Sequence, residues 1–491
     1  MKKKAKIALA ALGAAAAANA VHAAVYRPKK TDIPALPKEA VNVDRYRQNL
    51  AKAIQFKTIS YRETNRVDWN EFKKFHKFLD EAYPLIAEKL EEEVIPPANL
   101  LYRWKGTNSE LKPIALLSHQ DVVPVSEGTE QDWKYDAFSG HDDGEFVWGR
   151  GAVDMKNHLI AVMEAVEALL EDGFQPERDV YLLFGDNEEV VANDENGALD
   201  LMTTLKNRGI SLDSVLDEGG AFIPLNIPGV LNDKILAGIG VAEKGYADIE
   251  IVCNAKGGHS SQPPVHSALG ELAEAIRALE ANQFKASFNE NMKSLIDSVS
   301  REFTYPVRLI SCNVPLLRPA LLEVCKQIPF AACLVRTTTA VTMAQGSPAA
   351  NVLPQRASAT VNFRAMPGTT KEDLVAHIRS VVKNKDLEIN ILNAKEASKF
   401  SPTDSRSYNI IAELCKAILP NSVVAPYLVM GGTDAYHYED ICENIYRFAP
   451  FQLDIALLRC AHGTNERLPI SAMENGLVFF KNYIKRASAE N

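Results

Sequence analysis

Residues 114–121 read IALLSHQD, an apolar run that ends in a histidine and an aspartate two positions apart. Apolar runs predict strands at 114–118, 146–149, 180–184 and 214–216, and amphipathic stretches between them predict helices at 159–170 and 197–207. Strands that alternate with helices of this length predict an α/β fold with helices on both faces of a mostly parallel sheet. In such sheets, ligands collect at the carboxyl ends of the strands.

Polar clusters follow these predicted strands directly. They are SHQD (His119, Asp121), GRGAVDMK (Asp154), GDNEE (Glu188, Glu189) and LDEGG (Asp217), and AHGTNE adds His462 near the C-terminus. Each cluster is a weak signal alone, because polar residues often follow strands. Together they place two imidazoles and several carboxylates at one sheet edge, a donor set that suits two zinc ions with mixed nitrogen and oxygen ligands.

A smaller unit interrupts the pattern between residues 245 and 395. Its elements follow the β-α-β-β-α-β order of the two-layer ferredoxin-like plan, at 247–252, 267–280, 334–343, 357–364, 371–382 and 387–392. The stretch at about 283–330 is too long for a simple connection, and we expect an irregular insertion at the mouth of the site or at a subunit contact. Residues 44–244 and 396–491 then form one catalytic domain that carries 245–395 as an inserted lid and dimerisation domain.

Residues 1–24 differ from the rest of the chain. A basic start, MKKKAK, precedes an Ala-rich apolar stretch with small residues at positions that suit cleavage. The segment predicts an export signal, with an uncleaved membrane anchor or a fortuitous Ala-rich tail as alternatives, because residues 7–26 are just long enough to span a bilayer. Residues 25–43 are expected to form a tether. The predicted location is periplasmic, secreted or lumenal, with or without anchoring in the membrane.

Composition excludes several classes of protein. The 491 residues carry 54 Lys and Arg against 63 Asp and Glu, a formal net charge of −9. An acidic chain of this kind is a poor nucleic-acid binder, because neutralising phosphates needs a basic surface. The seven cysteines are odd in number and show no CxxC spacing, which argues against a disulfide framework and a thiolate zinc site.

The ordered set of motifs resembles the dinuclear zinc aminoacylase/carboxypeptidase family, specifically its carboxypeptidase S and N-fatty-acyl-amino-acid hydrolase branch. The stretches that carry the resemblance run from about residue 44 to 486: LLSHQDVVPV, WGRGAVDMKNHL, GDNEEV, VLDEGG, VAEKGYADIEI, GGHSSQPP, RTTTAVTM, ANVLPQRASATVNFRAMPG, GGTDAYHY, IYRFAPF and AHGTNERLPI. The resemblance implies a zinc-peptidase-like catalytic domain with an inserted lid, in agreement with the strand and helix pattern.

The resemblance also implies two zinc ions per subunit and assigns their ligands. Asp154 resembles the carboxylate that bridges both ions. His119 and Asp217 resemble the remaining ligands of one ion, and Glu189 and His462 those of the other.

Two further residues resemble the family's catalytic groups. Glu188 resembles the general base that takes a proton from the bridging water and passes it to the leaving amine. Asp121 resembles the aspartate that accepts a hydrogen bond from His119, from the imidazole N–H on the nitrogen that does not bind the metal.

The lid is implied to contribute to the site as well. His259 resembles a histidine that reaches the active site of the other subunit and stabilises the oxyanion, so a homodimer through the lid is expected. Asn351 and Arg364 resemble residues that hold the substrate carboxylate. A loop in the large domain resembles a substrate-binding segment, formed by Gly431, Gly432, Thr433 and Asp434.

The sequence departs from the family pattern at two places. Asn187 stands before the glutamate pair where the family usually has Asp, and this loss of a charge or hydrogen bond is expected to tune the base or the zinc affinity. Ala435 and Tyr436 stand where relatives often have Ser and Arg, so the side-chain preference is expected to differ and Arg364 to supply more of the carboxylate contact.

The predicted function is that of an exported di-zinc hydrolase. It would cleave an amide beside a free C-terminal carboxylate, in a short peptide or in an N-acyl amino acid. A dipeptidase or a deacylase for small acyl groups is the alternative within the family. A metal-retaining but inactive peptide-binding protein and a structural surface protein without metal are the alternatives from other classes. The acyl group, the amino-acid preference and the physiological metal stay open at this point.

Overall fold

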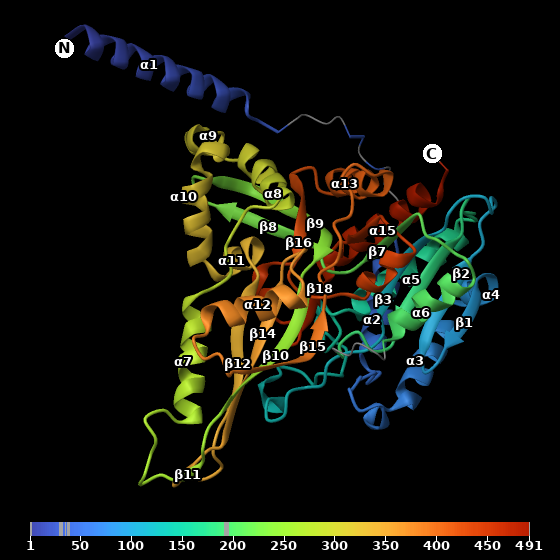
Figure 1. Ribbon diagram of the computed structural model, residues 1–491. Coiled ribbons are helices and arrows are strands. Elements are labelled where there is room, and N and C mark those ends of the chain that lie inside the picture. The colour runs from blue at the N-terminus through green and yellow to red at the C-terminus, as the bar shows by residue number, and fades with distance from the viewer. Residues whose placement is uncertain (1, 29–32, 35, 37–39, 191–195, 491) are drawn as a thin grey trace.

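The computed structural model describes residues 2–28, 33–34, 36, 40–190 and 196–490, so part of the predicted tether lies outside the described residues. Within them, nine strands form the large sheet, eight in the order β1-β2-β6-β3-β7-β17-β9-β16 with β8 paired to β9 (Figure 1). Their bounds are β1 Glu91–Ile95, β2 Asn99–Trp104, β3 Ile114–His119, β6 Val180–Gly185, β7 Ser214–Asp217, β8 Phe222–Ile227, β9 Leu231–Glu243, β16 Ser422–Val429 and β17 Ile445–Arg447.

The centre of this sheet is parallel. Strand β3 runs parallel to β6 and β7, β7 runs parallel to β17, and β9 runs parallel to β16. The pairs β1–β2, β2–β6, β17–β9 and β8–β9 are antiparallel. The predicted α/β class with a mostly parallel central sheet is confirmed. The carboxyl ends of β3, β6 and β7 meet at one edge, where the polar clusters of the sequence follow them.

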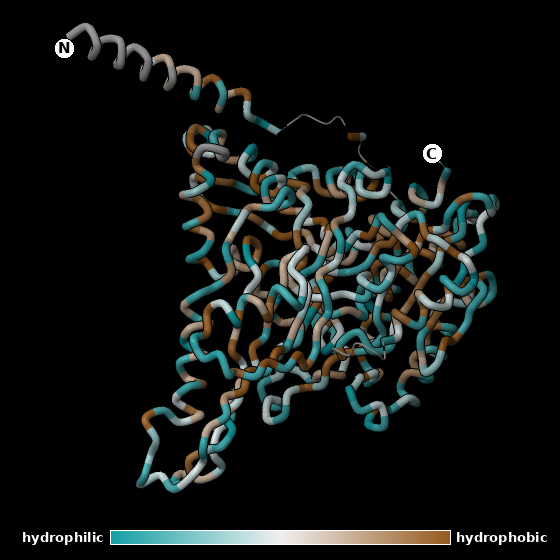
Figure 2. Tube along the Cα trace, in the orientation of Figure 1, coloured by the Kyte–Doolittle hydropathy of each residue, from teal (hydrophilic) through white to brown (hydrophobic). Residues whose placement is uncertain are grey.

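Successive side chains along each strand point to opposite faces of the sheet, so they pack into two separate hydrophobic cores. Leu116 lies in a core with α2 (Val43–Ile54), α5 (Lys156–Glu171), α13 (Arg406–Ile418) and α15 (Ile470–Ser488) on one face. Ala115 and Leu117 lie in a second core with α6 (Gly197–Asn207) and η3 (Asp434–Asp440) on the other. Figure 2 shows apolar and polar residues alternating along the chain through the body. Both faces of the sheet are thus covered, as strands apolar at successive positions require.

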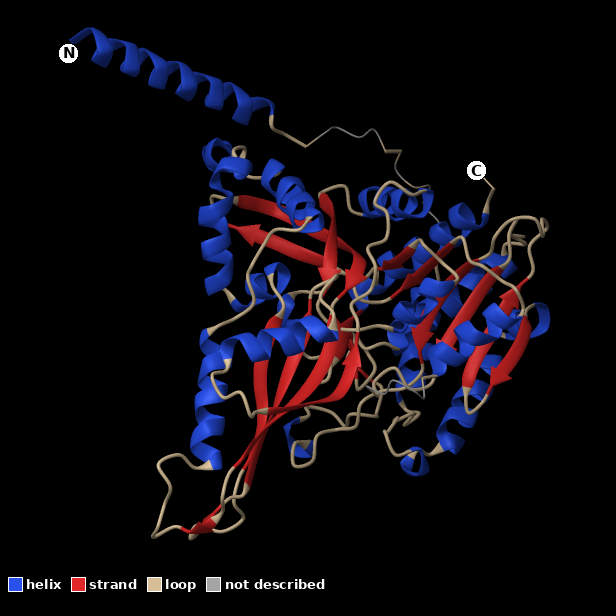
Figure 3. Cartoon of the chain, in the orientation of Figure 1, coloured by secondary structure: helices blue, strands red, loops and turns tan. Residues whose placement is uncertain are grey.

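The lid begins where β9 runs into β10 (Gly245–Asn254), with Lys244 as the one residue between them. The described part of the lid sheet has four strands in the antiparallel order β12-β14-β10-β15, formed with β12 Thr338–Gln345, β14 Arg356–Ala365 and β15 Glu388–Lys395. Helices α7 (Ala268–Ala281) and α12 (Lys371–Val381) pack into one core with this sheet (Figure 3). The predicted β-α-β-β-α-β order is therefore found.

The insertion inside the lid is helical rather than irregular. It folds into α8 (Glu290–Arg301), α9 (Tyr305–Ser311), α10 (Val314–Gln327) and α11 (Pro329–Val335). Prolines occupy the first turns of α9, α10 and α11, where a missing N–H costs nothing because that group has no partner in the helix. Because α11 extends to Val335, the strand predicted at 334–343 begins only at Thr338.

One predicted strand lies outside the large sheet. Residues Phe146–Trp148 form β5, which pairs with β4 (His141–Asp142) and β18 (Arg467–Pro469) in a separate small sheet. This pairing joins the GRGAVDMK segment to the AHGTNERLPI segment, although they are about three hundred residues apart in the sequence. Asp154 and His462 are thereby brought to the same edge of the molecule.

The N-terminal helix α1 (Lys2–Val25) projects from the body but is held at its C-terminal end (Figure 1). Tyr26 donates a hydrogen bond to Asp297 of α8 at 2.6 Å, and the Asn19 amide donates to the Leu309 carbonyl of α9 at 2.9 Å. No helix in the described residues is both long and apolar enough to cross a membrane. The two hydrogen bonds from Tyr26 and Asn19 show that the helical insertion of the lid contacts the N-terminal segment.

Candidate metal centre and active site

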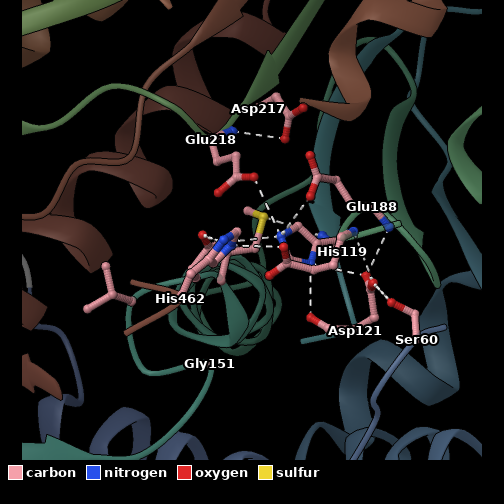
Figure 4. A network of polar contacts seen from close by, with 12 residues as sticks. Ser60, His119, Asp121, Gly151, Glu188, Asp217, Glu218 and His462 are labelled. Carbon is pink, nitrogen blue, oxygen red and sulfur yellow. Dashed lines mark hydrogen bonds and ion pairs between the residues drawn. The ribbon is translucent and has the colours of Figure 1, made fainter. Parts of the chain in front are cut away.

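Two histidines, His119 and His462, flank the carboxylate of Asp154. Figure 4 shows these two histidines within the polar cluster. His119 ends β3 and is 1% exposed, and its Nε2 lies 3.2 Å from Oδ1 of Asp154. His462 precedes β18, and its Nε2 lies 3.1 Å from Oδ2 of the same carboxylate. Each oxygen of Asp154 thus faces a different imidazole, which is the arrangement expected of a carboxylate shared between two metal ions.

The glutamate pair after β6 lies on either side of this centre. Oε2 of Glu189 is 2.8 Å from Nε2 of His462, and Oε2 of Glu188 is 3.9 Å from Nε2 of His119. Oε1 of Glu189 is buried without a hydrogen-bond partner among the described residues. A buried carboxylate oxygen without a partner is costly, so this atom marks a place where a cation or a donor fits.

Two neighbouring acidic residues, Asp217 at the end of β7 and Glu218 directly after it, point in different directions (Figure 4). The carboxylate of Asp217 accepts the N–H of Glu218 at 2.8 Å and the N–H of Ala435 at 2.9 Å. Oε1 of Glu218 lies 3.5 Å from Nε2 of His119, and Glu218 lines the cleft described below. The structure therefore brings Glu218, which the sequence analysis missed, to the position expected for Asp217. Its one signal in the sequence is that it follows Asp217 directly.

Among the residues that the structure describes, possible metal-ligand atoms within 4.8 Å of one another form two overlapping groups. They are His119, Glu188 and Glu218, and His119, Asp154 and Glu189.

Asp121 is fully buried behind these groups and orients several of them. Its Oδ1 lies 3.2 Å from Nδ1 of His119. Its two oxygens accept the backbone N–H groups of Glu188 and Glu189, both at 3.1 Å, and Ser60 donates its hydroxyl to the same carboxylate. One carboxylate therefore positions the histidine and the segment that carries the glutamate pair.

Glu466 is a second positioning residue, and the sequence analysis did not single it out. Its Oε1 accepts the N–H groups of Gly151, Val153 and Asp154 at 3.0, 2.8 and 3.0 Å. Its Oε2 accepts a hydrogen bond from buried Arg150 at 2.6 Å. The loop that presents Asp154 is thus held by a charged residue four positions after His462.

The electrostatics of the cluster favour bound cations. Burial and the neighbouring Asp154 raise the pKa of Glu218 to about 8, and they raise that of Glu189 to about 7. Hydrogen bonds to Asp154 and Glu189 raise the pKa of His462 to about 10. Carboxylates that are buried close together repel one another strongly, because water does not screen their charges. Bound divalent cations relieve that repulsion. Two imidazoles among four carboxylates are a donor set that zinc prefers.

A cleft of about 720 Å³ opens over the cluster, between the large sheet and the lid. The predicted substrate-binding residues that line it are Arg364 from β14 and the loop Gly431, Gly432, Thr433 and Asp434. No carboxylate in the described part of the chain forms an ion pair with Arg364, whose guanidinium instead lies 4.7 Å above the Tyr246 ring. This cation is available to an anionic group in the cleft.

His259 and Asn351 lie elsewhere. His259 belongs to β11 (Gly258–His259), which pairs with β13 (Val352–Leu353) directly after Asn351. The paired strands β11 and β13 project at the tip of the lid (Figure 1), and both side chains are exposed. Neither residue lines the cleft of its own chain. The structure brings these two residues together but not to the cluster.

The departures noted in the sequence have local explanations. Oδ1 of Asn187 accepts the N–H of Gly197 at the start of α6 at 2.7 Å, a contact that an amide oxygen makes as well as a carboxylate does. Ala435 is fully buried in the second core, where its N–H reaches Asp217. The Tyr436 ring lies 4.2 Å below Nζ of Lys395.

Comparisons with known proteins agree with this geometry. A family described as peptidase family M20/M25/M40 matches residues 115–486. The chain is 38% identical over 444 residues to a probable carboxypeptidase S-like 2 of Dictyostelium discoideum, covering 89% of this chain and 84% of that protein. It is 31% identical over 446 residues to the N-fatty-acyl-amino acid synthase/hydrolase PM20D1 of Xenopus tropicalis, covering 90% and 86%. The family resemblance of the sequence motifs is confirmed.

Solved structures share the fold. An M20 family metallo-carboxypeptidase from Sulfolobus solfataricus superposes with a TM-score of 0.63 at 18% identity, over 90% of this chain and 99% of that one. Human carnosine dipeptidase 1 gives a TM-score of 0.63 at 13% identity, over 91% and 96%. At these identities the likeness concerns the fold alone.

Proposed function

This chain belongs to peptidase family M20/M25/M40, and from that premise we propose that it is an exported di-zinc hydrolase of amides beside a free carboxylate. The substrate class is a short peptide with a free C-terminus or an N-acyl amino acid. The observation that carries the proposal is the position of Asp154 between His119 and His462, with an unpaired cation in the cleft above.

The residues fit two metal ions. Asp154 would be shared, His119 and Glu218 would hold one ion, and Glu189 and His462 would hold the other. Glu218 takes the place first predicted for Asp217, because Asp217 is committed to two backbone N–H groups. When bound, zinc supplies Lewis acidity and a water of lowered pKa.

Glu188 is proposed as the proton carrier. Its side chain lines the cleft, its backbone is fixed by Asp121, and burial raises the pKa of its carboxyl well above the usual range. It takes one proton from the attacking water and delivers it to the leaving nitrogen as the carbon–nitrogen bond breaks. Asp121 contributes by holding His119 and the glutamate segment in one orientation.

Arg364 is proposed to bind the substrate carboxylate. A guanidinium can donate two parallel hydrogen bonds to a carboxylate, which fixes the amide beside it. The loop Gly431 to Asp434 forms the opposite wall, and its Thr433 N–H is itself fixed by Glu243 at 2.6 Å. The scissile amide would then lie between the lid cation and the metal cluster.

His259 and Asn351 are proposed to act in the cleft of a second subunit. Both lie at the exposed β11–β13 strand pair, away from their own cleft, and the lid sheet has an edge strand, β12, with exposed positions. Edge strands of this kind pair readily with a second copy. In the proposed homodimer, His259 would donate a hydrogen bond to the developing oxyanion.

Export is proposed from the N-terminal segment, whose helix lies largely outside the folded body (Figure 1). N-terminal sequencing of the protein from fractionated cells would test this. A mature chain starting near residue 21 or 24 indicates cleavage, and a chain that keeps residues 2–25 in a membrane or extracytoplasmic fraction indicates retention. Recovery of the protein in the cytoplasm would contradict export.

The test of the reaction is a product screen. Zinc-loaded protein would be incubated with N-acyl amino acids of short and long acyl chains and with dipeptides, and products followed by liquid chromatography. We expect turnover of free acids and its loss on C-terminal amidation. Turnover limited to short acyl chains or dipeptides favours the alternative within the family. Two bound zinc ions with binding but no turnover favours the binding protein, and absence of metal contradicts the proposal.

A further inference from the structure

The lid presents a second cation to the cleft in the same row as Arg364. Arg364 on β14 is paired with Tyr246 on β10, and Tyr246 is paired with Lys395 on β15. Residues paired across neighbouring strands lie on the same face of a sheet, so the three side chains form one row. All three line the cleft, and two strand spacings place the ends of the row about 10 Å apart.

Among the described residues, the carboxylate within ion-pair distance of Lys395 is that of Glu243, and it is already neutralised. Nζ of Lys395 lies 3.9 Å from Oε1 of Glu243, at the limit of an ion pair. The same oxygen accepts a hydrogen bond from buried Arg447 at 3.2 Å, and the other oxygen accepts the Thr433 N–H at 2.6 Å. Glu243 is fully buried and is balanced by Arg447. Glu243 therefore needs no further counter-ion, and the ammonium of Lys395 lies at the cleft surface.

The surroundings of Lys395 leave its ammonium group accessible to a ligand. Its side chain is 22% exposed, and the ammonium lies 4.2 Å above the Tyr436 ring. On the side of Gly432, a Cβ would meet Nζ at 3.5 Å, so the absent side chain keeps this approach open. An ammonium over an aromatic face with an open approach can accept an anion without giving up its ring contact.

We propose that Lys395 is a specificity-determining residue that binds a second carboxylate, that of an acidic side chain on the amino acid released from the C-terminal side of the amide. The inference rests on the proposed function, in which Arg364 takes the main-chain carboxylate. With that group on Arg364, the side chain of a glutamate or aspartate residue extends along the row toward Lys395. The substrate class is thus N-acyl or peptidyl glutamate and aspartate.

Matched substrate pairs test this inference. Values of kcat and KM would be measured for N-acyl-glutamate against N-acyl-glutamine, and for the aspartate and asparagine pair, with wild type and Lys395→Met. Lys399→Met is the matched control, because Lys399 is exposed and lies outside the cleft. We expect wild type to favour the acid about tenfold, mainly through KM, Lys395→Met to bring the ratio near one, and Lys399→Met to keep it.

A binding measurement separates this inference from the proposed function. Calorimetry with Glu188→Gln protein and the same acid and amide ligands reports the preference without turnover. The inference is supported if the double variant Lys395→Met/Glu188→Gln binds the acid ligand more weakly than Glu188→Gln does, while both proteins bind the amide ligand equally well. This outcome would support it even if no substrate is cleaved. Turnover of both amino-acid types with a ratio that Lys395→Met leaves unchanged would overturn the inference while the proposed function stands. Equal affinity of the Glu188→Gln protein, in which Lys395 is intact, for the acid and amide ligands would also overturn the inference.

Discussion

Oε1 of Glu218 lies 3.5 Å from Nε2 of His119, while the carboxylate of the preceding Asp217 is turned to the N–H of Ala435. Adjacent residues at the end of one strand thus take different roles. Glu218 faces the cleft and the imidazole, and Asp217 ties the strand end to the segment that begins η3.

The two residues can be told apart by metal content. We expect Glu218→Gln to lower zinc below two equivalents, because an amide is a poorer ligand than a carboxylate. Asp217→Asn should keep zinc but lose about 1–3 kcal/mol of stability, because one backbone N–H loses a charged acceptor. Metal analysis and chemical denaturation measure these effects. Loss of zinc in Asp217→Asn with full zinc in Glu218→Gln would restore Asp217 as the ligand.

Replacing the proposed base should separate catalysis from metal binding. Glu188→Gln keeps the shape of the side chain but cannot take a proton, so kcat should fall by about 10²- to 10⁴-fold. Zinc content should stay at the wild-type value. Glu396→Gln removes an exposed carboxylate at the rim of the same cleft and serves as the control, with kcat expected near wild type. Near-normal turnover by Glu188→Gln would exclude it as the base.

The carboxylate contact can be tested from both partners. Arg364→Ala and amidation of the substrate remove the same proposed interaction, so their effects on kcat/KM should not add. Arg356→Ala is the matched control, since Arg356 lies at the far end of the same strand and pairs with Glu250 at 2.7 Å. In the Arg356→Ala variant, amidation of the substrate should lower kcat/KM by the same factor as in wild type. Additive losses with Arg364→Ala would place the carboxylate on another residue.

Mixing inactive subunits tests the proposed dimer. His259→Ala should lower kcat by about 10²- to 10³-fold with zinc intact, the effect of losing one oxyanion donor. When His259→Ala subunits are mixed with Glu188→Gln subunits, activity should return. One cleft of each mixed dimer then has an intact Glu188 from one subunit and an intact His259 from the other. His266→Ala, an exposed histidine a few residues further along the same loop, should behave as wild type. An active monomer by light scattering and no recovery on mixing would show that His259 acts within its own chain.

Lys244 predicts a pH-dependent contribution to stability. It joins β9 to β10 and donates to the carbonyls of Cys333 and Arg336, and burial lowers its pKa from 10.5 to about 8. The native state releases this proton near pH 8, and the unfolded chain keeps it until about pH 10.5. The cost of burying the charge is therefore fully present below pH 8 and is relieved as the pH rises.

Between pH 7.5 and 10, wild type should gain about 2–3 kcal/mol of unfolding free energy relative to Lys244→Met, since each pKa unit corresponds to about 1.4 kcal/mol. Chemical denaturation of both proteins at the two pH values, at constant free zinc, measures the difference. A difference that does not change with pH would show that Lys244 keeps an ordinary pKa in the folded chain.

Local patterns predicted much of the fold. The strands at residues 114 and 180 and the helix Gly197–Asn207 were found within a residue of the predicted bounds, because their apolar periodicity is long and uninterrupted. The insertion was not predicted as helical, because prolines at helix starts resemble loop signals when the register of the helix is unknown. The strand pair β8 and β9 was also not assigned, and its partners β16 and β17 come from residues about two hundred positions later.

By itself, the sequence determined the kinds of ligand atoms, their order and their placement just after strands, because these depend on residue identity and on local periodicity. Tertiary structure alone decided which of Asp217 and Glu218 faces His119, since successive side chains leave a strand end in different directions. It also decided that Arg364, Tyr246 and Lys395 form one row, because strand pairing brings together residues far apart in the chain. Residue type is a local property, whereas direction and proximity depend on how distant strands pack against one another.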